Sequence, residues 1–306
     1  MTRISTLNQQ QSVIGQMLRS QIELADTQRQ VSTGYKADRY EGLARDTAAL
    51  VSARAIESRT TQYIELGQQI NGQLSLQDTG LSTIYDAAKN LRDSLLSSLA
   101  NNSGRVIVPE LESAFVSGKS VLNTRYAGKY LYSGARTDVP PFNAVDLADL
   151  SVLASPIASF FDNNQQKAQV RMDQNQIVEY GVLADEMGKD FMASIKRLGE
   201  YNAATPFGVS LTPADRAILQ TELTNLDAVM SGIIKLQANN GFTGKRIESI
   251  ISRHESLVIV NKQLIADISE VDMAEAITRF NQDKLAVESS YNLLRQMTQI
   301  SLLNFL

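Results

Sequence analysis

The chain of 306 residues contains no cysteine, no tryptophan and a single histidine, His254. Without cysteine it cannot form a disulfide, and with one histidine a zinc site of the usual kind is nearly excluded. Charged neighbours flank His254 in the segment 252–256, which predicts a solvated helix face rather than a metal ligand or a catalytic base. No glycine-rich phosphate-binding motif occurs either. We therefore expect no cofactor, no metal and no enzymatic activity.

The sequence also lacks long hydrophobic runs and an excess of positive charge. No apolar run approaches the roughly 18 residues that a membrane-spanning helix needs, so we expect no membrane span. The N-terminal segment has no apolar core of the kind found in a Sec signal peptide. Lys and Arg together number 29 against 33 Asp and Glu, a net charge of −4. This balance disfavours nucleic acid and anionic membranes as partners.

A helical pattern dominates the C-terminal segment. Between Ile265 and Ile300 there is neither proline nor glycine, and apolar residues recur in steps of three, four or seven, with one slip between Ile268 and Ile277. The pattern predicts one long helix that packs against another helix. The apolar positions that define its face are Ile277, Phe280, Val287, Tyr291 and Leu294, and the chain ends in Leu302, Leu303, Phe305 and Leu306. An apolar terminus is unusual in a solvated chain and indicates a surface kept for a partner.

The N-terminal segment has a similar but thinner pattern. Its apolar positions are Ile4, Leu7, Ile14, Leu18, Ile22 and Ala25. Alone this segment is a marginal helix, so we expect it to pair with the C-terminal helix as a coiled coil. Gly34 stands where a helix C-cap is expected. The apolar faces of the two terminal helices could also form an ordinary intramolecular core. Contact between subunits is favoured because the apolar C-terminal residues extend beyond the surface that one partner helix could cover.

Between the two ends the pattern predicts more helices and a small β-containing segment. Helices are expected from Asp46 to about Leu99, from Glu110 to about Tyr126, over 185–201, and from Thr212 to about Asp267 with a possible interruption at 239–241. A strand is expected over 129–133, and a hairpin is expected from 168–172 and 176–182. The fold class is therefore mainly α: a long antiparallel helical bundle or coiled coil formed by the two halves of the chain, with a small β-containing insert.

Several short motifs give the chain a resemblance to a known family. They are Arg3-Ile-Ser-Thr6 with Gln9-Gln-Gln11, Gln30-Val-Ser-Thr-Gly34, Gly128-Lys-Tyr-Leu-Tyr-Ser-Gly134, Asp272-Met-Ala-Glu275 and Ser301-Leu-Leu-Asn-Phe-Leu306. The chain resembles the bacterial flagellin superfamily, and within it the hook-associated proteins that join hook to filament. One departure follows Gly34, where the family's usual Asn and paired Asp are replaced by the segment 36–46.

The resemblance implies a domain organisation and a function. Residues 1–40 and 265–306 would form a terminal coiled-coil domain, residues 41–141 and 185–264 a long-helix domain, and residues 142–184 an outward-facing insert. Gly34, Asp46 and Asp272 would serve as hinge or linker positions. The function implied is that of a structural subunit at the hook–filament junction, in which the apolar residues of both terminal helices form the subunit interface.

The resemblance also implies partners and a location. The partners would be copies of the chain, other hook-associated and flagellin subunits, and an export chaperone on the C-terminal helix. The location would be the extracellular flagellum, reached through the flagellar type III apparatus. Flagellin, the main filament subunit, is the alternative, and a soluble helical binding module is a third possibility.

Overall fold

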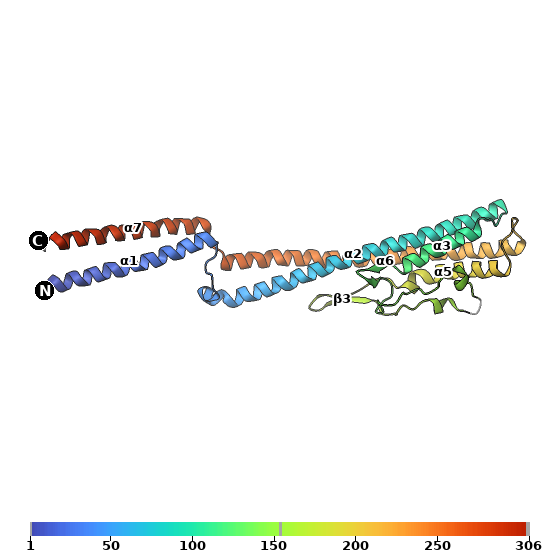
Figure 1. Cartoon of the computed structure of the whole chain (residues 1–306), viewed down its shortest axis with the longest axis horizontal. Helices are drawn as coiled ribbons and strands as arrows, with labels where there is room; N and C mark the ends of the chain where they lie inside the picture. The colour runs from blue at the N-terminus through green and yellow to red at the C-terminus, as the bar shows by residue number, and fades with distance from the viewer. Residues whose placement is uncertain (1, 153–154, 304–306) are drawn as a thin grey trace. The chain divides into compact units, whose positions relative to one another are not determined.

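A computed structural model of the chain describes residues 2–152 and 155–303 and is mainly helical, with two small antiparallel sheets, as the sequence predicted (Figure 1). Its helices are α1 (Thr2–Thr33), α2 (Thr47–Asn101), α3 (Ile107–Leu122), α4 (Leu147–Leu150), α5 (Ala184–Ala204), α6 (Pro213–Ser269) and α7 (Met273–Leu303), with the 3-10 helices η1 (Tyr40–Asp46) and η2 (Ile157–Phe160). Its strands are β1 (Arg125–Tyr126), β2 (Lys129–Tyr130), β3 (Ala168–Asp173) and β4 (Gln176–Tyr180).

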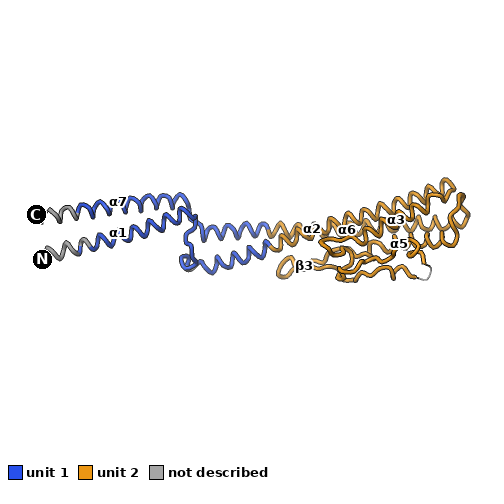
Figure 2. The backbone as a smooth tube through the Cα atoms, viewed as in Figure 1, with its two compact units in different colours: residues 1–61, 255–306 blue, residues 62–254 orange. Residues whose placement is uncertain are grey.

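The chain divides into two compact units (Figure 2). Unit 1 consists of residues 1–61 and 255–306, and unit 2 consists of residues 62–254. Unit 1 contains α1, α7, η1, the first turns of α2 and the last turns of α6. Unit 2 contains α3, α5, both sheets and the remaining parts of α2 and α6.

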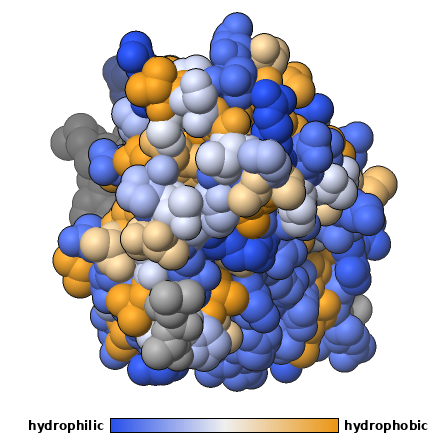
Figure 3. Space-filling view, turned by 90° about the vertical axis from the view of Figure 1, so that its right-hand side faces the viewer, coloured by the Kyte–Doolittle hydropathy of each residue, from blue (hydrophilic) through white to orange (hydrophobic). Residues whose placement is uncertain are grey.

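Unit 2 is built around one large hydrophobic core shared by α2, α3, α5 and α6. Its fully buried side chains include Leu91 of α2, Leu111 of α3, Phe191 of α5 and Leu226 of α6. Residues of the insert, such as Phe142, complete this core from the outside. Seen from the end where α2 finishes and α6 begins, hydrophobic and hydrophilic residues are interspersed on the surface (Figure 3). Burial of the shared core is the main source of stability for this unit.

The hairpin β3–β4 covers a second, smaller core between α2 and α6. The strands pair antiparallel, with Val170 opposite Val178. Side chains of a strand alternate between its two faces, and here one face carries Val170, Met172 and Val178 against Ile70 and Ile251 of the two helices. The hairpin that the sequence predicted is therefore confirmed.

Helix α6 begins at the capping signal that the sequence shows. The Thr212 backbone N–H donates to the Asp215 carboxylate over 2.7 Å, and the Asp215 N–H donates to the Thr212 hydroxyl over 3.2 Å. This reciprocal pair satisfies two backbone donors that a helix N-terminus leaves free. The interruption expected at 239–241 is wrong, because the helix continues through it and the buried Asn240 amide donates to the Leu74 carbonyl over 2.8 Å.

Three other boundaries differ from the prediction. Helix α3 ends at Leu122 rather than near Tyr126, because Arg125–Tyr126 pair with β2 as strand β1. The strand expected over 129–133 is limited to Lys129–Tyr130, and the chain then turns through Gly134, whose φ is +65°. The single C-terminal rod is in fact two helices, because α6 ends at Ser269 and α7 begins at Met273. The slip in apolar spacing between Ile268 and Ile277 coincides with this break. The break arises because Asp272 caps the start of α7.

Candidate assembly surface

Helices α1 and α7 lie side by side in unit 1 and run antiparallel (Figure 1). Their least exposed positions recur in alternating steps of four and three, which is the heptad spacing of a coiled-coil seam. On α1 these positions are Val13, Met17, Ser20, Leu24, Thr27 and Val31, and on α7 they are Ala276, Phe280, Asp283, Val287, Ser290 and Leu294. Several of them are small or polar, so the seam buries little apolar area and stabilises the pair weakly.

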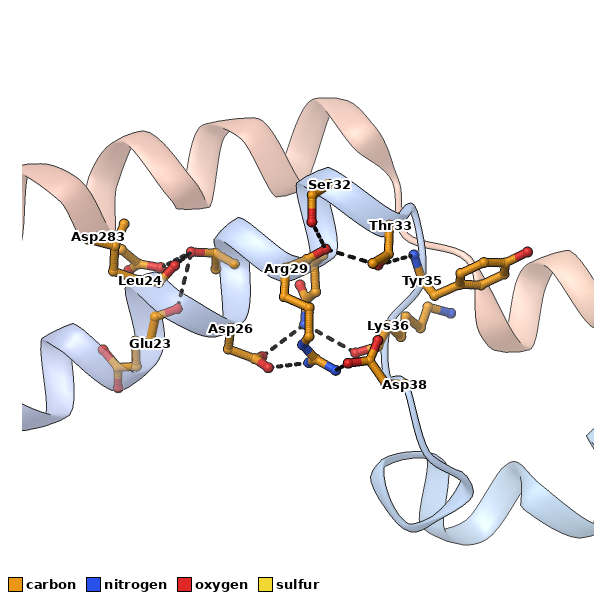
Figure 4. Close-up of polar contacts among 12 residues, drawn as sticks. Glu23, Leu24, Asp26, Arg29, Ser32, Thr33, Tyr35, Lys36, Asp38 and Asp283 are labelled. Atoms are coloured by element: carbon orange, nitrogen blue, oxygen red, sulfur yellow. Dashed lines mark hydrogen bonds and ion pairs between the residues drawn. The ribbon is translucent and has the colours of Figure 1, made fainter.

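Two polar contacts cross the seam and set its register. The buried Thr27 hydroxyl donates to the Asp283 carboxylate over 3.0 Å, and the Gln21 amide donates to the Tyr291 hydroxyl over 2.7 Å. Asp283 points from α7 towards α1 (Figure 4). A polar residue in a coiled-coil seam fixes the alignment of the helices at a cost in stability. Sequence reasoning missed Thr27 and Asp283, although the heptad spacing through them was present in the sequence.

Three large apolar side chains of α1 lie beside the seam rather than in it. Ile14, Leu18 and Ile22 recur every four residues and are 38%, 51% and 70% exposed. We call these three residues the outer row. On α7, Ile277 and Tyr291 are also about half exposed, at 45% and 51%. Exposed apolar residues gathered on one helix face indicate a surface that another protein covers.

The two terminal helices pair as expected, but the face of α1 that was expected to contact α7 is wrong. Phe280, Val287 and Leu294 lie in the seam as expected. Ile14 and Leu18 do not pack across it, because the heptad that runs through Val13 and Met17 turns them outwards. Sequence reasoning placed Ile14 and Leu18 at the contact, whereas α1 approaches α7 along the row that runs through Val13, Met17 and Leu24.

Six predicted interface residues cannot be placed in this way. The side chains of Ile4, Leu7, Leu302 and Leu303, and the whole of Phe305 and Leu306, lie outside the described part of the chain. Their proposed role in subunit contacts stays a prediction.

Helix α1 ends at Thr33, and the next residue, Gly34, lies opposite the break between α6 and α7. Gly34 has φ +76°, and its N–H donates to the Gln30 carbonyl over 2.8 Å, which closes the helix. Its carbonyl accepts from the Val271 N–H over 3.0 Å, and the Lys36 N–H donates to the Ser269 carbonyl over 2.8 Å. Two backbone hydrogen bonds thus join the end of α1 to the α6–α7 break.

Asp272 caps α7 on the other side of this junction. Its carboxylate accepts from the Ala274 N–H over 2.8 Å and from the Glu275 N–H over 3.2 Å. Of the three predicted hinge positions, Gly34 and Asp272 both lie at this junction, because Gly34 is hydrogen-bonded to Val271, the residue before Asp272. Asp46 is instead the last residue of η1, exposed next to the start of α2.

An ion-pair network lies at the C-terminal end of α1. The Arg29 guanidinium lies between the carboxylates of Asp26 and Asp38, with 3.2 Å to the latter (Figure 4). Hydrogen bonding to Asp38 and Asp26 outweighs the effect of burial and raises the pKa of Arg29. Asp38 belongs to the segment after Gly34 in which the sequence departs from the family pattern. This segment is held to α1 by that ion pair.

His254 occupies a different environment from the one expected. It is only 5% exposed, its ring stacks on Tyr63 with 5.4 Å between centroids, and its Nε2 lies 2.7 Å from the Met172 carbonyl. The prediction of a solvated face is wrong, because the hairpin β3–β4 covers this side of α6. The contact attaches the hairpin to α6 and gives His254 a structural role.

The part of the chain that the structure describes shows no cluster of metal ligands and no membrane-spanning helix. In residues 2–152 and 155–303 no three His, Cys, Asp or Glu side chains gather as metal ligands. Within the same residues, no helix combines the length and the apolar character needed to cross a bilayer.

Two family models match most of the chain. The model of the bacterial flagellin N-terminal helical region matches residues 4–137, and the model of the bacterial flagellin C-terminal helical region matches residues 223–306. No curated protein sequence matched the chain.

Solved structures share the fold at low sequence identity. A chain from Vibrio parahaemolyticus assigned as a flagellar hook-associated protein superposes with a TM-score of 0.60 at 19% identity, over 72% of this chain and 96% of that one. FlgL of Bacillus cereus superposes with a TM-score of 0.55 at 12% identity, over 71% and 99%. FlgL of Xanthomonas campestris gives 0.55 at 14% identity, over 71% and 99%.

Proposed function

Because this chain belongs to the bacterial flagellin superfamily, a family of structural and non-enzymatic proteins, we propose that it is a subunit of the bacterial flagellum that polymerises through α1 and α7 at the hook–filament junction. The observation that carries the proposal is the outer row, whose three large apolar side chains face solvent beside a thin seam. A free monomer gains nothing from this arrangement. A neighbouring subunit that covers the outer row would remove that apolar surface from water.

The proposal includes partners and a location. The outer row and the apolar C-terminus would contact copies of the chain and adjoining hook-associated and flagellin subunits. Before assembly, a chaperone on the C-terminal helix would shield the apolar C-terminus during export through the flagellar type III apparatus. The working location would then be the extracellular flagellum. Contacts with neighbouring subunits would stabilise the paired helices α1 and α7, because any partner that binds only the folded state shifts the equilibrium towards it.

Flagellin, the main filament subunit, is the second candidate, since both family models carry its name. The segment Gly128–Gly134 and the ending Asn304-Phe305-Leu306 resemble hook-associated proteins and favour the junction. Copy number separates the two functions, because a junction protein is present in few copies and a filament protein in many. Quantitative mass spectrometry of purified flagella measures it directly. A soluble helical binding module would instead be absent from purified flagella.

The outer row itself is tested by Leu18→Asp combined with Ile22→Asp. Both residues are at least half exposed, so the monomer is expected to fold normally, while two charges would be buried without partners in an assembled contact. We expect incorporation into flagella to fall at least about tenfold, as measured by immunoblot in cells that lack the wild-type protein.

The matched control is Ser12→Asp combined with Gln16→Asp, which adds the same charge at exposed polar positions of the same helix. This control is expected to incorporate normally. Normal incorporation of the Leu18→Asp/Ile22→Asp protein would refute the outer row as an assembly surface.

A further inference from the structure

A cavity of about 490 Å³ opens in unit 2 between α2 and the chain around β1, β2 and the ends of the hairpin. It has the size of a small-molecule site, for which volumes of roughly 300–1,000 Å³ are typical. The residues that line it include three glutamines and three tyrosines, which can form hydrogen bonds with a ligand: Gln69, Gln73, Gln77, Tyr126, Tyr130 and Tyr180. None of these residues belongs to unit 1, so the cavity is separate from the proposed assembly surface.

The glutamines form a row that leads from the rim of the cavity to its floor. They recur every four residues on α2 and therefore lie on one face of the helix. Gln69 is exposed, Gln73 is half-buried and Gln77 is only 3% exposed. Each primary amide offers a carbonyl acceptor and two N–H donors. The row thus places amide donors and acceptors from the exposed end of the cavity to its buried end.

The carbonyl oxygen of the deepest of these amides lacks a partner. Gln77 Oε1 is buried and accepts no hydrogen bond from the protein. A buried acceptor left unpaired costs about 1–3 kcal/mol, so natural structures rarely keep one without a reason. Gly181, with φ +96°, lies against this amide, and a Cβ there would be 3.3 Å from Gln77 Nε2. Glycine at 181 keeps side chains away from the floor of the cavity.

The tyrosines supply flat apolar walls that end in hydroxyl groups. The Arg125 guanidinium lies over the Tyr130 ring, 4.4 Å from its centroid, and donates to its hydroxyl over 2.6 Å. These contacts hold the Tyr130 ring in place. Tyr180 is half-buried, and burial raises its pKa, so its hydroxyl stays protonated at neutral pH. Aromatic rings next to amides suit a ligand that has both apolar C–H faces and hydroxyl groups.

The charge of the lining argues for a neutral ligand. The Lys167 ammonium is paired with the Glu186 carboxylate over 2.9 Å, and Lys129 is exposed at the rim. No carboxylate occurs among the described residues that line the cavity. An anion would therefore meet one positive charge, that of Lys129, which solvent screens, and a cation would find no counter-charge.

We propose that this cavity binds a neutral saccharide of one or two rings. Hydroxyl groups of the sugar would pair with the amides of Gln73 and Gln77, and a C–H face of the sugar ring would pack on the tyrosines. The site is independent of the proposed polymerisation, because its residues belong to unit 2 and the outer row belongs to unit 1.

The test is saturation-transfer difference NMR on the full chain with glucose, galactose, N-acetylglucosamine and maltose. Millimolar binding of at least one of these is expected, and glucose 6-phosphate and glucosamine are expected to bind more weakly than the neutral sugars. Gln73→Met and Gln77→Met keep the side-chain volume but remove the amides. Each is expected to weaken binding about tenfold, the effect of one lost hydrogen bond to a buried group.

Gln68→Met is the matched control, since Gln68 is exposed on the same helix and does not line the cavity. It is expected to bind like the wild type, and thermal melts establish that each variant is folded. Because Gln73 is half-buried, its variant remains informative if Gln77→Met unfolds. The proposal is overturned if no neutral sugar binds, if the charged sugars bind equally well, or if the folded variants bind as tightly as Gln68→Met.

Discussion

Gly80 of α2 lies against Tyr132, a side chain that is fully buried in the core of unit 2. The Tyr132 hydroxyl has no hydrogen-bond partner, and burial raises its pKa. A Cβ at position 80 would overlap that hydroxyl and would lie 3.1 Å from Val121. Glycine in the middle of a helix costs roughly 1 kcal/mol relative to alanine. At this position glycine is favoured because it leaves room for the buried Tyr132 side chain.

Gly80→Ala is therefore expected to lower the free energy of unfolding by about 1–3 kcal/mol, the usual effect of overpacking a core. Gly72→Ala on the same helix is the matched control, because the nearest atom to a Cβ there is the Tyr126 hydroxyl at 4.0 Å. It is expected to raise the free energy of unfolding by roughly 0.5–1 kcal/mol. Urea denaturation of both proteins checks the opposite signs, and equal effects would contradict this description of the core.

Asp215 gives a second prediction at the scale of one residue. Burial would raise its pKa, but hydrogen bonds from the Tyr201 hydroxyl, over 2.6 Å, and from Thr212 outweigh burial and lower the pKa. A carboxylate whose pKa is lowered on folding stabilises the folded state above its ordinary pKa. That stabilisation is lost as the pH falls through the lowered value.

Tyr201→Phe removes one of these donors, so the pKa of Asp215 is expected to rise. The difference in free energy of unfolding between about pH 7 and about pH 3 should then be smaller than in the wild type. Tyr85→Phe, at a half-buried tyrosine of α2, is the control and should leave that difference unchanged. An unaltered difference in the Tyr201→Phe protein would show that the tyrosine does not stabilise the ionised carboxylate.

At the scale of the element, α7 exists as a separate helix because Asp272 caps it. Two backbone N–H groups donate to this carboxylate, and a negative charge at a helix N-terminus is favourable. The sequence Asp272-Met-Ala-Glu275 has the spacing of a capping box, and it falls within the slip between Ile268 and Ile277. Together these two signals could have predicted the break.

Asp272→Ala is expected to destabilise the start of α7 by about 1 kcal/mol. Hydrogen–deuterium exchange of residues 273–280 in the monomer should speed up about fivefold as a result. Glu288→Ala, at an exposed position of the same helix, serves as the control and should leave exchange at the helix start unchanged. Unchanged exchange in the Asp272→Ala protein would mean that the cap does not define the helix.

The elements of the chain differ in how far their sequence determines them. The hairpin and the start of α6 could be predicted, because alternation and capping are local signals. The face of α1 that contacts α7 could not be predicted from residue size, since Val13 and Thr27 face the seam while Ile22 faces solvent. The burial of His254 was also beyond local reasoning, because the hairpin that covers it lies some eighty residues away in the sequence.

At the scale of the whole molecule, the two units contrast in what holds each of them together. Unit 2 has a continuous core of leucine, isoleucine and phenylalanine side chains from four helices. In unit 1, the α1–α7 seam includes Ser20, Thr27, Asp283 and Ser290, and large apolar residues remain exposed beside it. Regions with few buried apolar contacts open at low free-energy cost. Helices α1 and α7 are therefore expected to be the least stable part of the isolated chain.

Hydrogen–deuterium exchange of the isolated monomer and of the assembled protein tests this most directly. In the monomer we expect residues 13–31 and 276–294 to exchange at least about a hundredfold faster than the core of α3 and α5, and in the assembly we expect them to become protected. If α1 and α7 are as protected in the monomer as the core of unit 2, and gain nothing on assembly, the proposal that these helices are completed by neighbouring subunits is wrong.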